Sequence, residues 1–325
     1  MRPSPPDDTP ILDAADPAAL DRAAGLLDAG GCVAVPTETV YGLAADAACG
    51  EAVAGVYDAK DRPRFNPLIA HVDTIERARS LVELPDAALR LAEAIWPGPL
   101  TLVARRRPGA PVSDLAAAGL DTLAVRLPAS PALTGLVARL GQPLAAPSAN
   151  PSGQVSPTTA AHVKAGLNGR IPLILDGGPC RVGVESTIVS FADPGRPALL
   201  RPGGLAREKI TAIIGELGAP RADPDAPQAP GQLTSHYAPR AALRLNAKSV
   251  REGEAYLGFG APPEIEVYDF FNLSATEDLA EAAANLFVGL RALDRAADFI
   301  AVAPIPDHGL GEAINDRLRR AAAER

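Results

Sequence analysis

Two neighbouring stretches decide the fold of this chain: residues 35–44, which read VPTETVYGLA, and residues 60–72, which read KDRPRFNPLIAHV. The first follows an apolar strand, predicted over Cys32–Val35, and adds a proline and a cluster of hydroxyls. The second leads into a strand predicted over Leu68–Val72 and carries a Lys-x-Arg pair and a histidine. Strand ends that deliver hydroxyls, cations and a histidine are where α/β proteins bind anionic ligands. The two stretches therefore predict an α/β fold with a ligand site at its strand ends.

Helix and strand patterns alternate through the first two thirds of the chain. Asp16 and Pro17 predict a helix start, as N-cap and first-turn proline, and Gly30 with Gly31 predicts its end. Further helices are predicted over residues 51–59, 75–81, 85–95, 131–140, 157–165 and 207–217. Further strands are predicted over residues 100–104, 122–127, 144–146, 173–175, 187–191 and 199–201. Some strands follow one another directly, so we expect a mixed sheet rather than a purely parallel one.

The composition divides the chain into three parts. Residues 1–217 hold the first alternation and are expected to form the larger domain. Residues 218–240 contain five prolines and no apolar periodicity, which is typical of a linker. Residues 241–325 are expected to form a smaller α/β domain. Its strands are predicted over residues 243–245, 255–259, 265–268 and 299–302, with one helix whose buried stripe is Leu279, Ala283, Leu286, Leu290 and Leu293, and a final helix.

The charge of the chain argues against a nucleic-acid-binding block. The net charge of the 325 residues is −8. Residues 1–215 hold 20 Lys and Arg against 22 Asp and Glu, a net of −2, and residues 216–325 hold 11 against 17, a net of −6. We therefore expect no stable binding of nucleic acid. The cluster Arg105-Arg106-Arg107 leaves room for a small basic cleft, although a solvated strand end explains it as well.

The cysteines and histidines do not form a metal or disulfide pattern. Cys32, Cys49 and Cys180 are far apart and contain no C-x-x-C pair, so we expect a reduced, cytoplasmic protein. The histidines are scattered without the spacing of metal ligands. We also expect no signal peptide and no membrane association, because the N-terminus is rich in Pro and Asp and no apolar run is long enough to span a bilayer.

Several polar groups at predicted strand ends are candidates for binding a ligand. Thr37, Glu38, Thr39 and Tyr41 crowd into five positions between a proline and Gly42. Threonine and tyrosine are ordinary strand residues. The flanking Pro and Gly favour a bend instead, and a bent strand end that exposes hydroxyls and N–H groups is a plausible cradle for a small ligand. Both interpretations remain open on these residues alone.

The Lys-x-Arg pair suits a polyphosphate. Lys60 and Arg62 share one face of an extended segment, where lysine acts as a point charge and arginine as a fork. A solvated pair on a loop is the usual alternative for an isolated pattern of this kind. Asn66 and His71 follow, and a lone histidine on a strand more often has a structural role.

The strand over residues 122–127 has one polar face. Thr122, Ala124 and Arg126 alternate with apolar residues, and a buried arginine needs an anion from the protein or from a ligand. The loop over residues 145–153, AAPSANPSG, offers small residues and serine hydroxyls, although such a string is also a common turn. Further polar groups stand at strand ends in the triplet Glu185-Ser186-Thr187 and at Arg201.

Common alternative motifs are absent from the sequence. The chain contains no G-x-x-x-x-G-K-[ST] phosphate loop, no G-x-G-x-x-G and no G-x-S-x-G nucleophile elbow. The candidate site therefore does not match a P-loop, a dinucleotide-binding fold or a serine hydrolase.

Taken together and in order, the motifs are specific. The chain carries PTETVYGL, KxRPxxNPL, WPGPLT, VRxP, PSANxSG, ESTIV and LRPG. Over roughly residues 15–215 it resembles the YrdC-like threonylcarbamoyl-AMP synthase family. Residues 230–239, PGQLTSHYAP, are similar to the linker of the family's long form, and the end of the chain resembles its extra domain. Asp61 stands where many members carry glycine. The resemblance implies a twisted mixed-sheet YrdC-like domain followed by a smaller, Rossmann-like α/β domain.

The resemblance also implies a reaction. L-threonine, bicarbonate and ATP would give threonylcarbamoyl-AMP and pyrophosphate, so the enzyme would be a nucleotidyltransferase. The product would serve the threonylcarbamoyladenosine modification of tRNA, next to the anticodon, through downstream transferase machinery as partner. No covalent enzyme intermediate is needed, and catalysis would depend on positioning and on charge neutralisation by Lys, Arg and Mg²⁺.

The resemblance assigns roles to matching positions of this sequence. The residues implied for L-threonine are Thr39, His71, Arg126, Ala146 and Ser186, with Arg126 pairing the carboxylate. Those implied for ATP are Lys60, Arg62, Asn66, Thr122, Ser148, Ser156, Arg201 and Tyr237. Lys60 and Arg62 are also the implied catalytic residues, and Tyr237 would reach the nucleotide from the linker, which we expect to act as a lid.

Two other functions were weighed. A nucleic-acid-binding module would fit a concave family shape, but the net charges oppose it. The hydrogenase-maturation carbamoyltransferases also contain a YrdC-like unit, but they carry paired C-x-x-C motifs that three scattered cysteines exclude.

Overall fold

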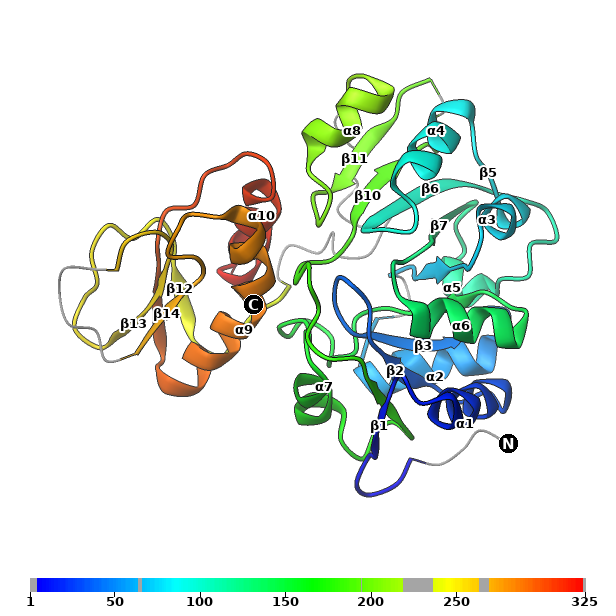
Figure 1. Ribbon diagram of the computed structural model, residues 1–325, viewed down its shortest axis with the longest axis horizontal. Helices are drawn as coiled ribbons and strands as arrows, with labels where there is room; N and C mark the ends of the chain where they lie inside the picture. Colours follow the sequence, from blue (N-terminus) through cyan, green and yellow to red (C-terminus); the bar gives the residue numbers. More distant parts are fainter. Residues whose placement is uncertain (1–4, 64–65, 194, 219–235, 263–268, 324–325) are drawn as a thin grey trace.

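A computed structural model describes residues 5–63, 66–193, 195–218, 236–262 and 269–323. Two sheets organise this part of the chain, and Figure 1 shows them side by side. The larger sheet is mixed and comes from the first two thirds of the chain, whereas the smaller one is parallel and comes from the last third. The predicted α/β class and mixed sheet are confirmed.

The described elements have the following bounds. The strands of the large sheet are β1 (Ile11–Asp13), β2 (Val33–Val35), β3 (Gly42–Asp46), β4 (Ile69–His71), β5 (Val82–Glu83), β6 (Leu100–Arg106), β7 (Thr122–Arg126), β8 (Leu144–Ala145), β9 (Ile174–Asp176), β10 (Thr187–Ser190) and β11 (Ala198–Arg201). Those of the small sheet are β12 (Ala242–Arg244), β13 (Glu254–Gly258), β14 (Phe270–Asn272) and β15 (Phe299–Val302). The helices are α1 (Pro17–Asp28), α2 (Gly50–Lys60), α3 (Ile75–Leu81), α4 (Asp86–Ile95), α5 (Asp114–Ala117), α6 (Pro131–Leu140), α7 (Ala160–Leu167), α8 (Arg207–Ile214), α9 (Leu279–Ala296) and α10 (Gly311–Ala321).

The large sheet runs in the order β1-β9-β2-β3-β8-β4-β7-β6-β10-β11, with β5 on β6. At one end, helices cover both faces. Because successive strand residues point to opposite faces, Val33 and Val35 pack with α1 and α6, whereas Ala34 packs with α2 and α7. This alternation explains why β2 is apolar throughout.

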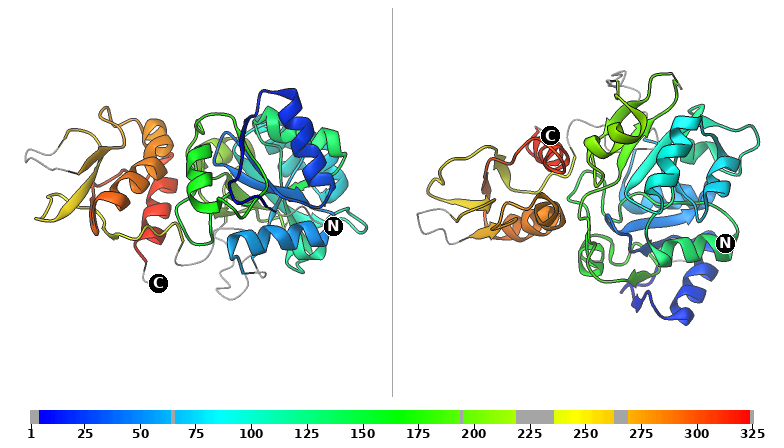
Figure 2. Two further views of the ribbon diagram at one scale, coloured as in Figure 1. Left: turned by 90° about the horizontal axis from the view of Figure 1, so that it is seen from below. Right: turned by 45° about the horizontal axis from the view of Figure 1, so that its top comes forward.

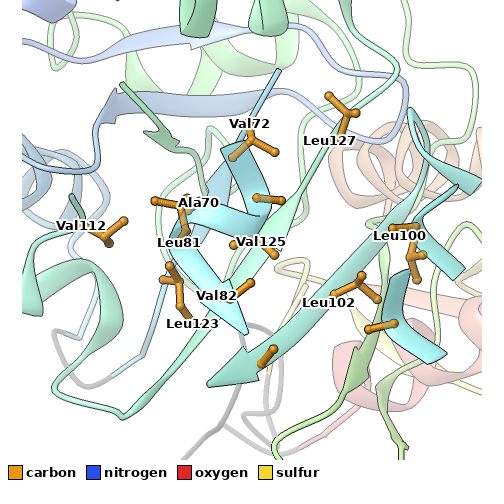
Figure 3. Packing of buried hydrophobic residues seen from close by; sticks show 14 of the residues in the cluster. Ala70, Val72, Leu81, Val82, Leu100, Leu102, Val112, Leu123, Val125 and Leu127 are labelled. Atoms are coloured by element: carbon orange, nitrogen blue, oxygen red, sulfur yellow. The ribbon is translucent and has the colours of Figure 1, made fainter. Parts of the chain in front are cut away.

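At the other end, the two faces differ. One face packs α3, α4, α5 and α8 against Leu102, Leu123 and Val125 in the largest core cluster (Figure 3). The opposite face carries a small apolar cluster that includes Ile69 and Ala124. Polar residues of β4 and β7 with the same parity as Ile69 and Ala124 therefore share that second face.

The small sheet runs in the order β12-β15-β13-β14, and all of its pairs are parallel. The predicted stripe of α9 is buried: Ala283, Leu286, Leu290 and Leu293 belong to the core of this unit. Figures 1 and 2 show α9 and α10 between the small sheet and the first unit. The two helices therefore form the side of the small unit that meets the rest of the chain.

The core of the small unit extends across this boundary. It includes Val40, Val155 and Val184, which come from the first unit, as well as Tyr237. The two units thus share one apolar cluster, and separating them would expose apolar surface of both.

Several elements differ from the sequence predictions. Pro36–Tyr41 is the loop between β2 and β3, which pair antiparallel from Val35 and Gly42, so a strand follows where only a bend was predicted. Strands β1 and β5 and the helix α5 were also not predicted. The helix predicted from residue 157 begins at Ala160, where Thr159 caps it through a hydrogen bond to His162. The strand predicted over residues 265–268 and most of the linker, residues 219–235, lie outside the described residues.

Of the helices in the described part of the chain, none combines the length and hydrophobicity that a membrane crossing requires.

Candidate active site

A small cavity lies where strand ends of the large sheet meet the segment that precedes β12. Its volume is about 50 Å³, well below the roughly 300–1,000 Å³ of pockets that hold drug-sized ligands. A nucleotide can therefore enter only if part of the lining moves. The cavity is lined by Thr39, Val40, Arg62, Ile69, His71, Arg126, Ala146, Pro147, Ser148, Glu185, Ser186, Arg201, His236 and Tyr237.

The register of the sheet brings two of these side chains together. β4 and β7 are parallel neighbours, and His71 is paired with Arg126. Both residues have the same parity as the small apolar cluster on the second face, so both point to that face. The polar face that the sequence predicted for residues 122–127 therefore faces the cavity at its Arg126 end.

Arg126 is buried and finds its anion within the protein. Its Nη2 lies 2.6 Å from Glu38 Oε1, and its Nη1 donates to Thr39 Oγ1 at 3.0 Å. The second oxygen of Glu38 is buried and has no hydrogen-bond partner among the described residues. The Thr37 hydroxyl lies 2.9 Å from that of Thr39 and orders the loop. The result is an ordered cluster of one cation, one carboxylate and two hydroxyls.

His71 is a neutral group in this site. Burial, and secondarily the charge of Arg126, lowers the pKa of His71 to about 3. Its Nδ1 lies 3.2 Å from the carbonyl oxygen of Ile69 and donates to it. At neutral pH the imidazole can therefore orient a ligand by hydrogen bonding, but it adds no charge.

Arg201 and Ser186 form the opposite wall. Arg201 Nη2 donates to the Ser186 carbonyl at 2.9 Å and lies 3.3 Å from the Ser186 hydroxyl. That hydroxyl lies 2.7 Å from the Thr101 hydroxyl on β6. Burial lowers the pKa of Arg201 from its ordinary value. The wall is thus a buried cation held by the backbone at the start of β10.

Lys60 and Arg62 flank a left-handed residue and do not share an extended face. Lys60 ends α2, and Asp61 caps it with φ 51°, a conformation that glycine adopts without strain. The Lys60 ammonium donates to the carbonyls of Ser148 and Asn150. Burial, together with Arg62, lowers the pKa of Lys60 well below its ordinary value. Lys60 therefore stabilises the loop over residues 145–153, on the side of that loop away from the cavity.

Arg62 reaches the cavity itself. Its Nη2 donates to the Pro67 carbonyl at 3.3 Å, and its Nε is buried with no hydrogen-bond partner among the described residues. Burial lowers the pKa of Arg62 to about 10. Since a buried unpaired N–H is costly, this donor is available to an anionic ligand.

Glu185 places a carboxylate in the cavity wall. Ser156 Oγ donates to its Oε1 at 2.6 Å, and Arg317 Nε on α10 donates to its Oε2 at 2.9 Å. Burial alone would raise the pKa of Glu185, but Arg317 and Arg201 outweigh burial and lower it to about 2. The group is therefore charged at neutral pH.

Two residues of the segment before β12 close the cavity. His236 and Tyr237 line it, and Tyr237 stacks on Phe287 of α9 with ring centres 5.6 Å apart. Tyr237 has φ 61°, which is strained for a bulky side chain. Burial raises the pKa of Tyr237 to about 12, so its hydroxyl is neutral.

Comparison with known proteins assigns the chain to a family. A model of the Sua5, YciO and YrdC proteins, described as telomere recombination, matches residues 25–203. A model described as threonylcarbamoyl-AMP synthase, C-terminal domain, matches residues 205–323. The chain is 41% identical to the threonylcarbamoyl-AMP synthase of Bacillus subtilis, over 98% of this chain and 97% of the relative. The chain belongs to the threonylcarbamoyl-AMP synthase family.

Two further similarities also extend over nearly the whole chain. It is 41% identical to the threonylcarbamoyl-AMP synthase of Pyrococcus abyssi, over 93% of this chain and 94% of the relative. A crystal structure of P. abyssi Sua5 complexed with L-threonine matches with a TM-score of 0.88 and 39% identity, over 97% of this chain and 98% of that one. The family resemblance predicted from the motifs is confirmed.

Most of the residues predicted for the synthase site line the cavity or lie next to its lining. Those that line the cavity are Thr39, Arg62, His71, Arg126, Ala146, Ser148, Ser186, Arg201 and Tyr237. Lys60 and Ser156 lie directly behind this lining, through Ser148 and Glu185 respectively. The Asn66 carbonyl accepts from the Tyr57 hydroxyl at 2.9 Å and from Arg62 at 3.5 Å. The structure therefore brings most of the predicted set to one place.

Thr122 is placed apart from the others. It begins β7, whereas Arg126 ends it, which separates the two by about 13 Å at roughly 3.3 Å per residue. Thr122 pairs with Arg105 on β6 and does not line the cavity. Its predicted role as an ATP contact stays a prediction.

Three residues at the cavity had no predicted role in the site: Glu185, His236 and Arg317. Glu185 was visible as the first residue of the ESTIV motif, and His236 as the neighbour of Tyr237. The buried position of Arg317 could not be predicted, because it stands in a helix rich in charged residues, a pattern that indicates a solvent-exposed surface.

Proposed function

We propose that the protein is an L-threonylcarbamoyladenylate synthase, a nucleotidyltransferase that converts L-threonine, bicarbonate and ATP into threonylcarbamoyl-AMP and pyrophosphate. The observation that carries the proposal is the match of both family models along one chain. The cavity supports it, because Arg126, Thr39 and His71 line it together with two further cations, Arg62 and Arg201.

The threonine end would be formed by Thr39, His71, Arg126, Ala146 and Ser186. The guanidinium of Arg126 would pair the carboxylate of threonine with the donors that Glu38 leaves open. A neutral His71 suits this role, because a second full charge would attract further anions. The neutral amine of threonine would react with bicarbonate to form a carbamate, with loss of one water.

The nucleotide end would be formed by Arg62, Ser148, Arg201 and Tyr237, with Lys60, Asn66, Ser156 and Thr122 as further predicted contacts. The carbamate oxygen would attack the α-phosphorus of ATP, and the bond to pyrophosphate would break. Lys60 and Arg62 would neutralise the charge that develops on the phosphates. Mg²⁺ would enter with ATP, since magnesium at such sites is held largely by substrate phosphates.

A closed site suits this chemistry, because the product is an acyl adenylate that water would destroy. We propose that residues 218–240 act as a linker and lid between a catalytic domain, residues 1–217, and a C-terminal domain, residues 241–325. The burial of Tyr237 in the cavity wall supports this. The product would pass to a tRNA threonylcarbamoyl transferase in the cytoplasm.

The test is pyrophosphate release by the purified chain. We expect release to require L-threonine and bicarbonate together, with threonylcarbamoyl-AMP detected by mass spectrometry. Serine should be a poorer substrate, because one lost methyl contact is worth about 1–3 kcal/mol. Equal release with any amino acid, or with none, would overturn the proposal.

A further inference from the structure

Arg317 comes from the C-terminal unit, but its side chain lies against the candidate active site. It stands on α10, is 0% exposed and is the largest of the fully buried side chains among the described residues. Its Nε donates to Glu185 Oε2 at 2.9 Å, and its Nη1 donates to the Pro202 carbonyl at 2.7 Å. Its guanidinium carbon lies 5.3 Å from the centre of the Tyr237 ring.

These contacts join two residues that line the cavity, Glu185 and Tyr237, to Pro202, which directly follows the lining residue Arg201. Glu185 precedes β10, Pro202 follows β11, and Tyr237 belongs to the segment before β12. Asp316 is the second acidic partner of Arg317, at 2.8 Å. One side chain from α10 thus fixes the ends of two strands and the aromatic ring that closes the cavity.

The negative charge of Glu185 would affect the binding of an anionic ligand. Glu185 lines a cavity whose proposed ligands include ATP, which carries several negative charges on its phosphates. An unpaired carboxylate in a buried wall would repel the phosphates, and the repulsion is strong where water is excluded. Arg317, which bonds Glu185 directly, offsets this charge together with Arg201, while Ser156 fixes the orientation of the other carboxylate oxygen.

We propose that Arg317 is a positioning residue of the nucleotide end of the site: it neutralises and orients Glu185 and supports the Tyr237 ring, so that the C-terminal domain completes the ATP-binding wall. The inference rests on the proposed function. It also gives the C-terminal domain a role in the reaction. A purely structural anchor between the domains is the alternative, and it predicts that both substrates suffer alike when Arg317 is changed.

The test compares substrate affinities of full-length variants by calorimetry, with circular dichroism as a check of folding. In Arg317→Met we expect ATP affinity to fall about tenfold or more, since one partner of a buried charge pair is removed. Threonine affinity should fall much less than ATP affinity, because among the described residues Arg317 has no hydrogen bond to Thr39, His71 or Arg126 and reaches Ser186 only through its neighbour Glu185. Arg319→Met removes an exposed charge from the same helix and should leave both affinities unchanged.

Two further variants separate charge from structure. Glu185→Gln in the Arg317→Met background should restore much of the ATP affinity, because it removes the uncompensated carboxylate. Arg317→Lys should be intermediate, since an ammonium keeps the charge but not the fork that reaches both Glu185 and Pro202. If Arg317→Met does not fold, Arg317→Lys alone and combined with Glu185→Gln carries the same comparison.

Different outcomes would contradict the role of Arg317 and the synthase activity on which that role depends. Unchanged ATP affinity in Arg317→Met, equal loss for both substrates, or no recovery with Glu185→Gln would overturn the role of Arg317. Failure of the wild-type chain to bind ATP would instead overturn the proposed function, and it would be seen before any variant is made.

Discussion

At the scale of single residues, Arg126 shows how far chemistry can be predicted from a pattern. Alternation along its strand required that its guanidinium be buried and paired, and both features are present. The partner was not predictable, because Glu38 lies 88 positions away in a loop that no local pattern connects to this strand, and carboxylates elsewhere in the chain or on a ligand were equally possible. Knowledge of the register between distant strands is needed to choose among them.

Replacing Arg126 should separate binding from stability. In Arg126→Ala we expect threonine affinity to fall by about 2–5 kcal/mol, with a smaller effect on ATP. Stability should also fall by about 3–5 kcal/mol, because Glu38 is left as a buried, unpaired charge. Calorimetry and urea denaturation measure the two effects.

Glu38→Gln in the Arg126→Ala background provides the control. It should recover much of the stability without recovering threonine affinity. Unchanged threonine affinity in a folded Arg126→Ala protein would show that the carboxylate of threonine lies elsewhere.

At the scale of elements, one glycine determines how closely two segments of the site can approach. Gly203 follows β11, and a Cβ built there would lie 2.4 Å from the Glu185 carbonyl oxygen and 2.5 Å from the Thr187 nitrogen. These are backbone atoms, which cannot rotate away. The glycine of the LRPG motif therefore allows the chain after β11 to pack against the start of β10, where Ser186 lies.

Gly203→Ala should destabilise the protein and disturb the wall around Ser186. We expect a loss of about 1–3 kcal/mol, as for other overpacked sites, measured by urea denaturation. Gly25→Ala is the matched control: Gly25 lies inside α1, a Cβ there meets nothing within 4 Å, and the change should stabilise by about 0.5–1 kcal/mol. Equal effects of the two substitutions would contradict the packing argument.

The elements that were predicted share a strong local pattern. β4 and β7 lie in short apolar or alternating stretches beside recognisable motifs, and α9 is a long segment with a clear helical period. β3 was missed because Gly42–Asp46, GLAAD, contains no β-branched or aromatic residue. β5 and α5 contain only two and four residues, so they have too little sequence to show a period. Their conformation is set by the neighbours they pack against.

At the scale of the whole molecule, the meeting of the two units was the least predictable feature. The family motifs located most of the cavity lining, because each motif is local. The contact between Glu185 and Arg317 spans 132 positions and joins two units. The local sequence around Glu185 and the local sequence around Arg317 do not indicate that the two side chains meet. Their contact can be seen only in the folded structure.

Acid should destabilise the protein before its carboxylates titrate. Burial lowers the pKa of His71 and that of His236 to about 3 each, from 6.5. Below pH 6.5 the unfolded chain gains these protons and the folded one does not, so stability falls as pH falls toward 3. At pH 5, which is 1.5 units below 6.5, each histidine costs about 2 kcal/mol at 1.36 kcal/mol per unit.

Urea denaturation at pH 7.5 and pH 5 measures this effect. His71→Asn should lose about 2 kcal/mol less than wild type on going to pH 5. The exposed His308, changed to Asn, should leave the loss as it is in wild type. A variant His71→Asn with the same pH dependence as wild type would show that the buried imidazole is not responsible.

The position of Arg317 near the end of the chain has a consequence for biosynthesis. The residues that line the cavity all precede it, and Arg201 does so by more than a hundred positions. At roughly 5–20 residues per second, a ribosome needs several seconds or more to make that interval. Throughout this time the first domain lacks the contacts that Arg317 makes to Glu185 and Tyr237. The nascent chain would therefore reach its full affinity for ATP only when α10 has emerged from the ribosome and docked.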